Sequence, residues 1–439
     1  MAGKDIETVT MPRVSRRVLP CLFALYIFAF LDRTNVSIAA LQMNSDLRLS
    51  PAAFGFGAGL FFLGYAVFEV PSNLILVRVG ARRWFARIAI TWGLLACSMM
   101  WVRSPIQFYS VRFLLGVAEA GLFPGVIYYL SHWFPESYRA RAIAGFSVAL
   151  PLSQAFGGPI GGALLGLGGI AHLSGWQWLF LVEGVPSVLI GIICLIYLPE
   201  RPDTSNWLST EQRAWLSTRI NREQQRVLAS DTLSHALANP LVWVLAVPYF
   251  VLNAVGYGYN FWAPTLVHEA LGTSNFATGL IFGIISLITA VFYVVSAYLS
   301  DRWDARCSGA ALGFALQFAG CFGLGILPNP LLRLVALTLI PIGSMVTVAP
   351  FWCLPTRFLK GTAAAAGIAL ISAIGSSGGF FGPTIIGFFR DRTGSNTGAF
   401  LGFSGLALVG SALCLVLRRT SAFRPGQFPA RAESSAPTR

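Results

Sequence analysis

The chain has 439 residues, of which 55% are hydrophobic and only 11% are charged, with a formal net charge of +13. A soluble domain carries about a quarter charged residues, so this composition excludes an ordinary soluble protein and is typical of a polytopic membrane protein. Seven widely spaced cysteines form no CxxC motif, so we expect no zinc site, no disulfide framework and no cofactor.

The chain opens with a polar stretch that ends without a small-residue cleavage site, so we predict a tail here and no cleaved signal peptide. Twelve apolar segments follow, each long enough to cross a bilayer as a helix. The fold class that they predict is an all-α membrane protein with twelve transmembrane helices, at 18–42, 54–77, 84–102, 105–131, 142–166, 177–198, 240–267, 276–299, 308–327, 331–354, 362–389 and 398–417.

An internal repeat divides these segments into two sets of six. RVGARR at Arg78 aligns with DRWDAR at Asp301, and GGPIGG at Gly157 aligns with FGPTIIG at Phe381, both with an offset of 224 residues. Coincidence among many glycines and prolines is the alternative, but a shared offset favours two pseudo-symmetric halves, as in secondary transporters. The predicted parts are a tail, a six-helix half, a linker, a second six-helix half and a tail, at 1–17, 18–198, 199–239, 240–417 and 418–439.

Positive charges predict the orientation in the membrane. One side carries the linker, both tails and the loops with Arg82, Arg83, Arg87, Arg139, Arg141, Arg302, Arg306, Arg357 and Lys360. The other side carries only Arg48, Arg103, Arg333, Arg390 and Arg392. By the positive-inside rule, both termini and the linker are predicted to be cytoplasmic. The basic balance is therefore topological, and no basic stripe interleaved with aromatic residues indicates nucleic-acid binding.

Six charged residues lie inside the apolar segments, where each costs roughly 2.5–3.5 kcal/mol: Asp32, Arg33, Glu69, Arg112, Glu119 and Glu183. At a rise of 1.5 Å per residue, Asp32 lies roughly 21 Å from the cytoplasmic end of its segment, at the same depth as Arg112. Glu119 follows Arg112 by seven residues and shares its helix face. We predict that Asp32, Arg33, Arg112 and Glu119 line a cavity in the first half. The alternative is that they are structural pairs, and it also applies to Glu69 and Glu183, whose roles stay open.

The second half lacks counterparts to these charges. The positions at the repeat offset are Gly256, Tyr257, Ala336 and Gly343, and the polar groups available are Tyr257, Tyr259, Asn260, Trp262, Trp352, Ser372 and Ser376. This asymmetry suits a substrate with an anionic end held by arginine and a neutral body. The four histidines lie in loops or at helix ends, so a buried proton carrier would be Asp32 or Glu119. A substrate bound to a neighbouring arginine would change the affinity of such a carboxyl group for a proton.

From about residue 15 to residue 420, the sequence resembles the major facilitator superfamily, and within it the anion:cation symporter family. The resemblance rests on FLDRTNVSIA, LGYAVFEVPSNLIL, RFLLGVAEAGLFPGVIYYLSHWFP, WQWLFLVEG and LPERPDTSNWL. It implies a permease for organic acids such as tartrate, phthalate or hydroxyphenylacetate. It also implies that Arg33 and Arg112 lie near the carboxylate, that Asp32 and Glu119 act in proton coupling, and that Tyr65 lies in the pocket. From the residues themselves we add Tyr257, Asn260 and Ser376 as substrate contacts.

The resulting prediction is a monomeric secondary active transporter of a bacterial inner membrane, which imports a small organic carboxylate together with protons. An anion exchanger or an efflux carrier of the same fold is an alternative, and so is a membrane sensor that binds an anion without moving it. Two halves that can rock against each other, without an appended signalling domain, favour transport. No HExxH motif indicates an intramembrane metalloprotease, and we predict no enzymatic activity.

Overall fold

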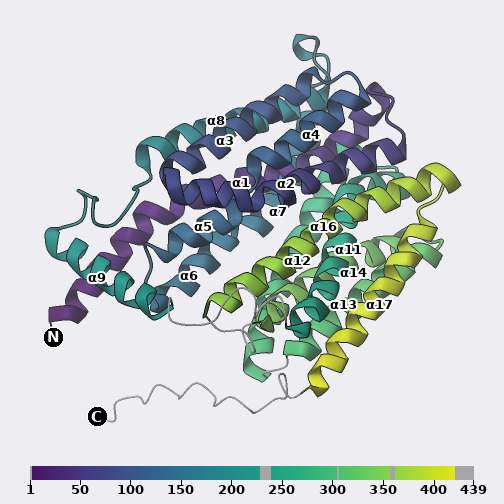
Figure 1. The fold of residues 1–439 in the computed structure, drawn as a ribbon. Coiled ribbons are helices and arrows are strands. Elements are labelled where there is room, and N and C mark those ends of the chain that lie inside the picture. The colour runs from purple at the N-terminus through teal and green to yellow at the C-terminus, as the bar shows by residue number, and fades with distance from the viewer. Residues whose placement is uncertain (1, 228–238, 304–305, 356–360, 421–439) are drawn as a thin grey trace. The chain divides into compact units, whose positions relative to one another are not determined.

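A computed structural model describes residues 2–227, 239–303, 306–355 and 361–420 (Figure 1). Within these ranges the regular structure is helical, and no strand occurs. The α-helices are α1 (Ala2–Asp46), α2 (Pro51–Val79), α3 (Ala81–Ser98), α4 (Pro105–Glu119), α5 (Leu122–Ser131), α6 (Glu136–Ser147), α7 (Ala149–Leu164), α8 (Gly175–Tyr197), α9 (Thr210–Val227), α11 (Pro240–Leu271), α12 (Asn275–Trp303), α13 (Arg306–Ile326), α14 (Pro330–Phe351), α16 (Gly361–Thr393) and α17 (Thr397–Arg419). Three short 3-10 turns are η1 (Met99–Trp101), η2 (Leu165–Leu167) and η3 (Ile170–His172).

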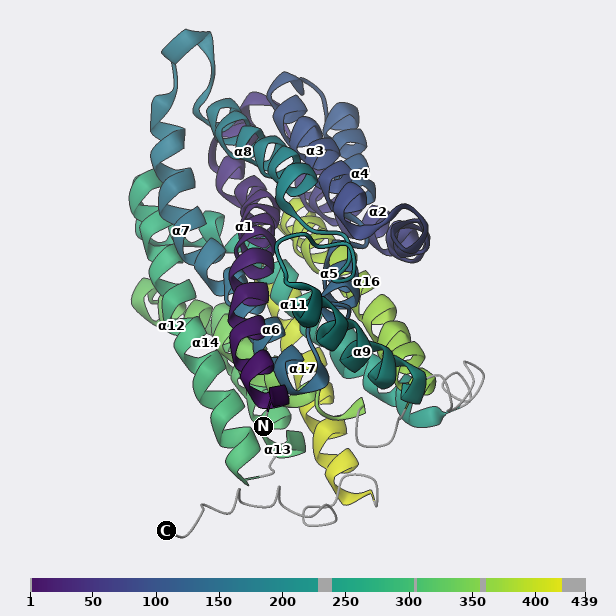
Figure 2. The same ribbon diagram turned by 90° about the vertical axis from the view of Figure 1, so that its left-hand side faces the viewer.

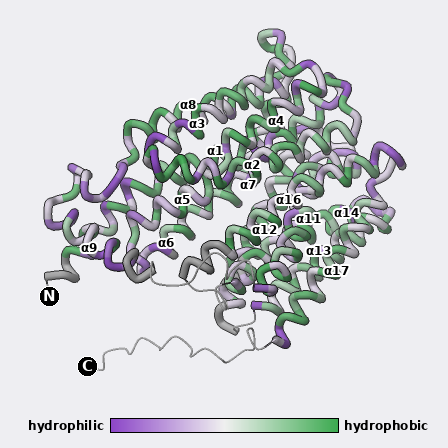
Figure 3. The backbone as a smooth tube through the Cα atoms, viewed as in Figure 1, coloured by the Kyte–Doolittle hydropathy of each residue, from purple (hydrophilic) through white to green (hydrophobic). Residues whose placement is uncertain are grey.

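Twelve stretches of the described residues are helical, long enough and apolar enough to cross a membrane, which confirms the predicted number of spans. In Figure 3 hydrophobic residues run along these helices, while hydrophilic residues gather near helix ends and around α9. The predicted N-terminal tail is helical from Ala2 and continues into the first span without a break. Within the predicted linker, 228–238 lie outside the described residues, and so do 421–439 of the predicted C-terminal tail and the loop residues Arg357 and Lys360.

Several helices begin where the sequence supplies a polar cap followed by proline. The Ser50 hydroxyl accepts a hydrogen bond from the backbone N–H of Ala53 (3.2 Å) at the start of α2. Ser104 before α4 and Asn329 before α14 are caps of the same kind. The side chain satisfies an N–H that has no partner in the first turn, and proline there forfeits no helical hydrogen bond.

The chain forms two compact units. Unit 1 comprises Met1–Ala229, Tyr257–Leu287 and Ser376–Ala399, and unit 2 comprises Ser230–Gly256, Ile288–Gly375 and Phe400–Arg439. Unit 1 therefore holds the first six spans together with segments of α11, α12 and α16. All of the residues that the sequence nominated for substrate binding and proton coupling belong to unit 1.

Close helix packing in unit 1 depends on glycine. α3 lies beside α8 in both ribbon views, and α2 packs on α4 (Figures 1 and 2). A Cβ atom at Gly93 of α3 would lie 2.9 Å from the carbonyl oxygen of Gly184 in α8. A Cβ atom at Gly64 of α2 would lie 2.5 Å from the carbonyl oxygen of Phe113 in α4. Small residues at these positions let the backbones approach closely, as is common between membrane helices.

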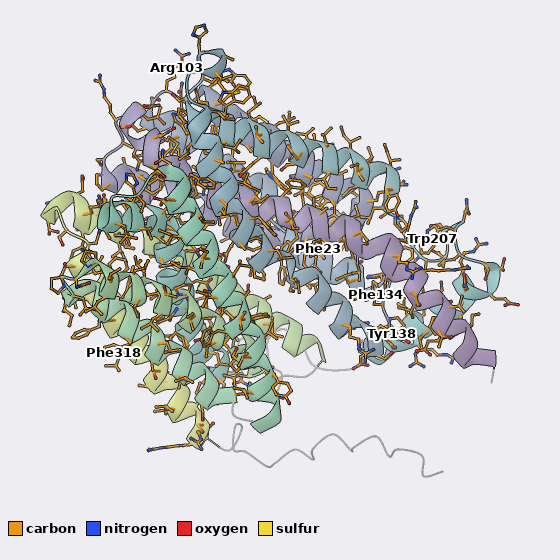
Figure 4. All side chains as sticks on the ribbon, turned by 180° about the vertical axis from the view of Figure 1, so that it is seen from behind. Phe23, Arg103, Phe134, Tyr138, Trp207 and Phe318 are labelled. Carbon is orange, nitrogen blue, oxygen red and sulfur yellow. The ribbon has the colours of Figure 1, made fainter. Side chains whose placement is uncertain are left out.

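The linker begins against the first six spans. Trp207 stacks on Trp133, with ring centroids 5.8 Å apart and an interplanar angle of 18°. Figure 4 labels Trp207 at one end of unit 1 and Arg103 at the other. The two ends of unit 1 are therefore distinguishable as a linker end and an Arg103 end.

The segments of α12 and α16 in unit 1 pack tightly on α7 and α2. A Cβ atom at Gly162 of α7 would lie 2.7 Å from the carbonyl oxygen of Asn275 at the start of α12. A Cβ atom at Gly59 of α2 would lie 2.7 Å from the carbonyl oxygen of Phe380 in α16. Any separation of these helices would have to open glycine-lined contacts on which no side chain intervenes.

Unit 2 is held together by α13 against α14 and by an apolar core. The Gln317 side chain donates a hydrogen bond to the Ser344 hydroxyl (2.7 Å) between the two helices. The core comprises Val242, Leu245, Ala246, Cys307, Phe351, Leu354, Ile371 and Leu417. Buried polar groups in a membrane protein have to be satisfied internally, and this pair satisfies one amide proton and one hydroxyl.

Candidate functional site

The fourth predicted span, 105–131, is two helices and not one. α4 ends at Glu119, and α5 begins three residues later, after Gly121, whose φ is +82°. A Cβ atom at Gly121 would also lie 2.6 Å from the Ser72 hydroxyl oxygen. Glycine meets both demands, because it adopts positive φ without strain and lets a neighbour approach closely. The break places the Glu119 carboxyl at the end of a helix inside unit 1.

The carbonyl groups that the break releases are satisfied by side chains of α2 and α3. Arg87 donates a hydrogen bond to the carbonyl oxygen of Ala118 (3.1 Å), and Ser72 donates one to the carbonyl oxygen of Ala120 (2.6 Å). Irregular backbone at membrane depth is tolerated only where such partners exist. Discontinuous helices of this kind form binding sites in many transporters.

Glu119 pairs with Arg33. Arg33 Nη2 lies 2.5 Å from Glu119 Oε1, and the Glu119 side chain is only 1% exposed. The Arg33 guanidinium also lies 5.0 Å from the ring centroids of both Phe30 and Tyr65. The pair joins α1 to the end of α4, and Tyr65 of α2 supplies an aromatic wall beside it.

Arg112 has no such partner. Its side chain is fully buried, and its one hydrogen bond runs from Nη2 to the carbonyl oxygen of Ala58, at 3.5 Å. Nε and Nη1 make no hydrogen bond, and no carboxylate among the described residues lies within ion-pair distance. The guanidinium lies between aromatic rings, 5.1 Å from the centroid of Phe61 and 5.7 Å from that of Phe261. Buried donors are normally satisfied, so a missing acceptor on this scale needs an explanation.

Asp32 belongs to a different neighbourhood from Arg33. Its side chain is 2% exposed, and Oδ1 accepts a hydrogen bond from the Asn35 amide (3.2 Å) while Oδ2 has no partner. Asp32 lies within electrostatic reach of Arg112 but forms no ion pair with it. The structure thus brings the four predicted charges together, with a close contact only between Arg33 and Glu119.

A small cavity of about 20 Å³ opens beside Arg33. Its lining, all in unit 1, consists of Phe30, Arg33, Thr34, Gln154, Tyr257, Asn260 and Phe261. The volume is about that of one water molecule, so a carboxylate can enter only if the lining moves. Three of the predicted residues therefore share one cavity: Arg33, Tyr257 and Asn260.

The other predicted substrate contacts lie outside this lining. Tyr65 is buried behind Arg33, and Ser376 is partly buried in α16. Tyr257 also packs on Phe62, with ring centroids 4.2 Å apart. Sequence reasoning missed Gln154, although an amide inside an apolar segment carries the same kind of signal as a buried charge.

Residues 375–379, GSSGG, match the GxSxG string of serine hydrolases, a match that sequence reasoning overlooked. That motif works on a sharp strand-to-helix turn, whereas these residues lie inside the continuous helix α16. The string therefore indicates no nucleophile.

Comparisons with known proteins agree with this architecture. A family model described as Major Facilitator Superfamily matches residues 22–383. A protein of Agrobacterium vitis named "Putative tartrate transporter" is 44% identical over 418 residues, which are 95% of this chain and 93% of that protein. The "Quinolone resistance transporter" of Acinetobacter baumannii is 38% identical over 415 residues, which are 94% of this chain and 96% of that protein.

The fold is shared with solved transporter structures. A bacterial homolog of the human lysosomal transporter Spinster, in an inward-facing and occupied conformation, matches with a TM-score of 0.74 at 18% identity, over 92% of this chain and 96% of that one. At this identity the likeness concerns the fold alone. Together with the family match and the twelve spans, it identifies the chain as a member of the Major Facilitator Superfamily, a multi-pass membrane transporter and not an enzyme.

Proposed function

We propose that this transporter imports a small organic carboxylate, of which tartrate is the first candidate, across a bacterial inner membrane together with protons. The observation that carries the proposal is the unequal state of two buried arginines. Arg33 is neutralised by Glu119, whereas Arg112 is fully buried with two unpartnered donors. The relatives named as tartrate transporters supply the substrate class.

Arg112 is suited to bind a carboxylate end of the substrate. A guanidinium can donate two parallel hydrogen bonds to a carboxylate, and both of the donors needed, Nε and Nη1, are open. Gln154, Tyr257 and Asn260 line the neighbouring cavity and offer amide and hydroxyl groups to a hydroxylated body. The aromatic rings beside Arg112 exclude water, which strengthens the electrostatic attraction.

The Arg33–Glu119 pair offers a route to proton coupling. A proton on Glu119 removes the charge that holds Arg33, which frees this second guanidinium for the substrate anion. Conversely, a substrate that occupies Arg33 leaves Glu119 without its counter-ion and favours its protonation. Binding of the proton and binding of the anion thereby support each other, which is reciprocal coupling in the thermodynamic sense.

The complete assignment keeps the residues predicted from the sequence. Substrate binding is assigned to Arg33, Arg112, Tyr65, Tyr257, Asn260 and Ser376, and proton coupling to Asp32 and Glu119. The chain acts as a monomer of two six-helix halves, 18–198 and 240–417, with the 199–239 linker and both termini in the cytoplasm. Reporter fusions at the two termini test this orientation.

Glu119→Gln tests the coupling. The amide keeps the shape of the protonated acid and a hydrogen-bond donor, but it cannot release a proton. In proteoliposomes, the variant should exchange labelled for unlabelled tartrate yet fail to accumulate tartrate against a gradient. Asp32→Asn, measured alongside, tests the competing assignment of the main carrier. If Glu119→Gln accumulates tartrate like wild type while Asp32→Asn does not, Asp32 is the main carrier.

Wild-type protein tests the proposal as a whole. Uptake of labelled tartrate should stop when the pH gradient and the membrane potential are collapsed. Uptake that is indifferent to both would show that the carrier is not proton-driven.

Efflux by the same fold is the second candidate, because one relative is named for quinolone resistance. Right-side-out and inside-out vesicles with the same imposed proton gradient separate the two directions. Import predicts accumulation in right-side-out vesicles when the outside is acidic. Proton-driven accumulation in inside-out vesicles with an acidic lumen would instead support efflux.

A further inference from the structure

Glu183 is a third deeply buried acid of unit 1 that the proposed coupling does not use. It lies on α8 with a side chain only 5% exposed, and Oε2 has no hydrogen-bond partner. No arginine, lysine or histidine among the described residues forms an ion pair with it. A buried carboxylate without a counter-ion is strongly disfavoured, so this side chain has to be neutral or has to hold a cation.

The packing of α1 on α8 fixes which residues face Glu183. At one end the Trp176 indole donates a hydrogen bond to Asp46 (2.7 Å), and at the other Cys21 Sγ lies 3.2 Å from Cys194 Sγ. Because the two helices run in opposite directions, this register brings Glu183 level with Asn35. The Asn35 side chain indeed interacts with the Glu183 carboxyl group.

Asn35 connects Glu183 to Asp32. Its amide donates a hydrogen bond to Asp32 Oδ1 (3.2 Å), and it is itself only 3% exposed. Three oxygen atoms in this cluster are buried without a partner: Asp32 Oδ2, Asn35 Oδ1 and Glu183 Oε2. All are acceptors when the acids are charged, so the cluster lacks at least one hydrogen.

The other helices around α8 do not supply the missing charge. The titratable group of α3 that lies close is Cys97, whose thiol borders Gly184. α7, η1 and η2 contain no titratable residue. Asp32 is the one charged group that acts electrostatically on Glu183, and it has the same sign.

A charge count over the buried groups gives the same result. The fully buried acids are Asp32, Glu119 and Glu183, and the arginines among them are Arg33 and Arg112. Arg33 is matched by Glu119 through the ion pair, and Asp32 lies within reach of Arg112. One negative charge, on Glu183, is left over. A proton on this carboxyl group neutralises it and supplies the missing hydrogen.

We propose that Glu183, Asn35 and Asp32 form a second proton-binding site between α8 and α1, with the resident proton on Glu183 and Asp32 left charged opposite Arg112. The site is separate from the Arg33–Glu119 pair, since it uses the opposite side of α1. When a substrate anion occupies Arg112, Asp32 loses its counter-ion and the proton can be shared through Asn35. This role in transport rests on the proposed function, whereas the presence of the proton does not.

Infrared difference spectroscopy of purified protein at neutral pH detects the proton directly. A protonated carboxylic acid has a C=O stretching band that a carboxylate lacks. Glu183→Gln should remove one such band, and Asp32→Asn should keep it. Glu211→Gln, at an exposed position of α9, is the matched control and should leave the band unchanged. A band that survives Glu183→Gln, or that disappears only in Asp32→Asn, would overturn the proposal.

Asn35→Leu provides a second variant that leaves both acids in place. Removal of the bridging amide should shift the frequency of the Glu183 band, and an unshifted band would contradict the bridge. Sodium is the rival occupant of a cluster of oxygen atoms. Sodium chloride and choline chloride should therefore give equal melting temperatures, and a sodium-specific increase that is lost in Glu183→Gln would replace the proton by a metal cation.

Transport measurements separate this inference from the proposed function. If Glu183 takes part in coupling, Glu183→Gln should lower the number of protons moved per tartrate by one, read from the reversal potential. Absence of proton-driven uptake in wild type would refute the proposed function and leave the band assignment standing. Proton-driven uptake with an unchanged ratio and an unchanged band would refute the second site alone.

Discussion

Arg112→Lys should weaken substrate binding although it preserves the charge. The guanidinium presents Nε and Nη1 side by side, and neither has a partner in unit 1. Lysine replaces this fork by a single ammonium group that cannot hold both oxygen atoms of a carboxylate in the same plane. The substitution therefore tests whether Arg112 recognises the carboxylate by geometry and not by charge alone.

The magnitude follows from the hydrogen bond that is lost. A hydrogen bond to a charged group contributes about 1.5–3 kcal/mol, and the lysine variant would give up at least one of two. Because about 1.4 kcal/mol corresponds to a tenfold change, the Kd for tartrate should rise roughly 10- to 150-fold. Isothermal titration calorimetry on purified protein measures this change without any assumption about transport.

Arg390→Lys is the matched control for this prediction. Arg390 pairs with Glu269 near the end of α16 and lies over the ring of Trp262, away from the small cavity. Its replacement should leave the Kd within experimental error of wild type. Wild-type affinity in Arg112→Lys, with the melting temperature maintained, would show that Arg112 is a structural residue and not a ligand for the carboxylate.

Two glycine substitutions test the packing that positions the site. Gly121→Ala should lower the melting temperature and the transport rate more than Gly169→Ala does, because both have positive φ but only Gly121 has neighbours that a Cβ would meet. Thermal unfolding and uptake measure both variants, and equal effects would mean that φ strain alone matters. Gly158→Val should push α7 from Gly279 of α12 at a cost of about 1–3 kcal/mol to the packed conformation, whereas Gly166→Val, with open space around it, should be silent. Accessibility of a cysteine placed on α12 to a maleimide reads this change, and an unaltered labelling rate would argue against tight packing there.

The spans could be predicted from the sequence because the bilayer permits few alternatives. A segment of about 20 apolar residues has to be helical, since no water satisfies its backbone. The helical N-terminus before residue 18 could not be seen in this way, because hydropathy registers lipid contact and not helicity. The break at Gly121 was missed for a similar reason. Glycine followed by Pro124 is a signal for interrupted structure, but the surrounding apolar residues hid it.

Depth could be predicted, whereas pairing could not. Counting residues placed Asp32 and Arg112 at one level, and the structure brings the two within electrostatic reach. Which acid contacts which arginine depends on how each helix is rotated, and no periodicity in a helix that is apolar on most sides specifies this. The partner of Glu119 was therefore not foreseen, and neither was the neighbourhood of Glu183.

Rotation about α1 explains why an acid and a base stand next to each other in its most apolar part. Successive residues of an α-helix point about 100° apart, so Asp32 and Arg33 address different neighbours. Arg33 meets Glu119 at the broken end of the fourth span, while Asp32 and Asn35 address Glu183 on α8. α1 is thus the element that separates two acid networks, and Arg112 lies within electrostatic reach of both Asp32 and Glu119. An anion bound to Arg112 would act on both networks at once, so one binding event could change the protonation of Glu119 and of the Glu183 cluster together.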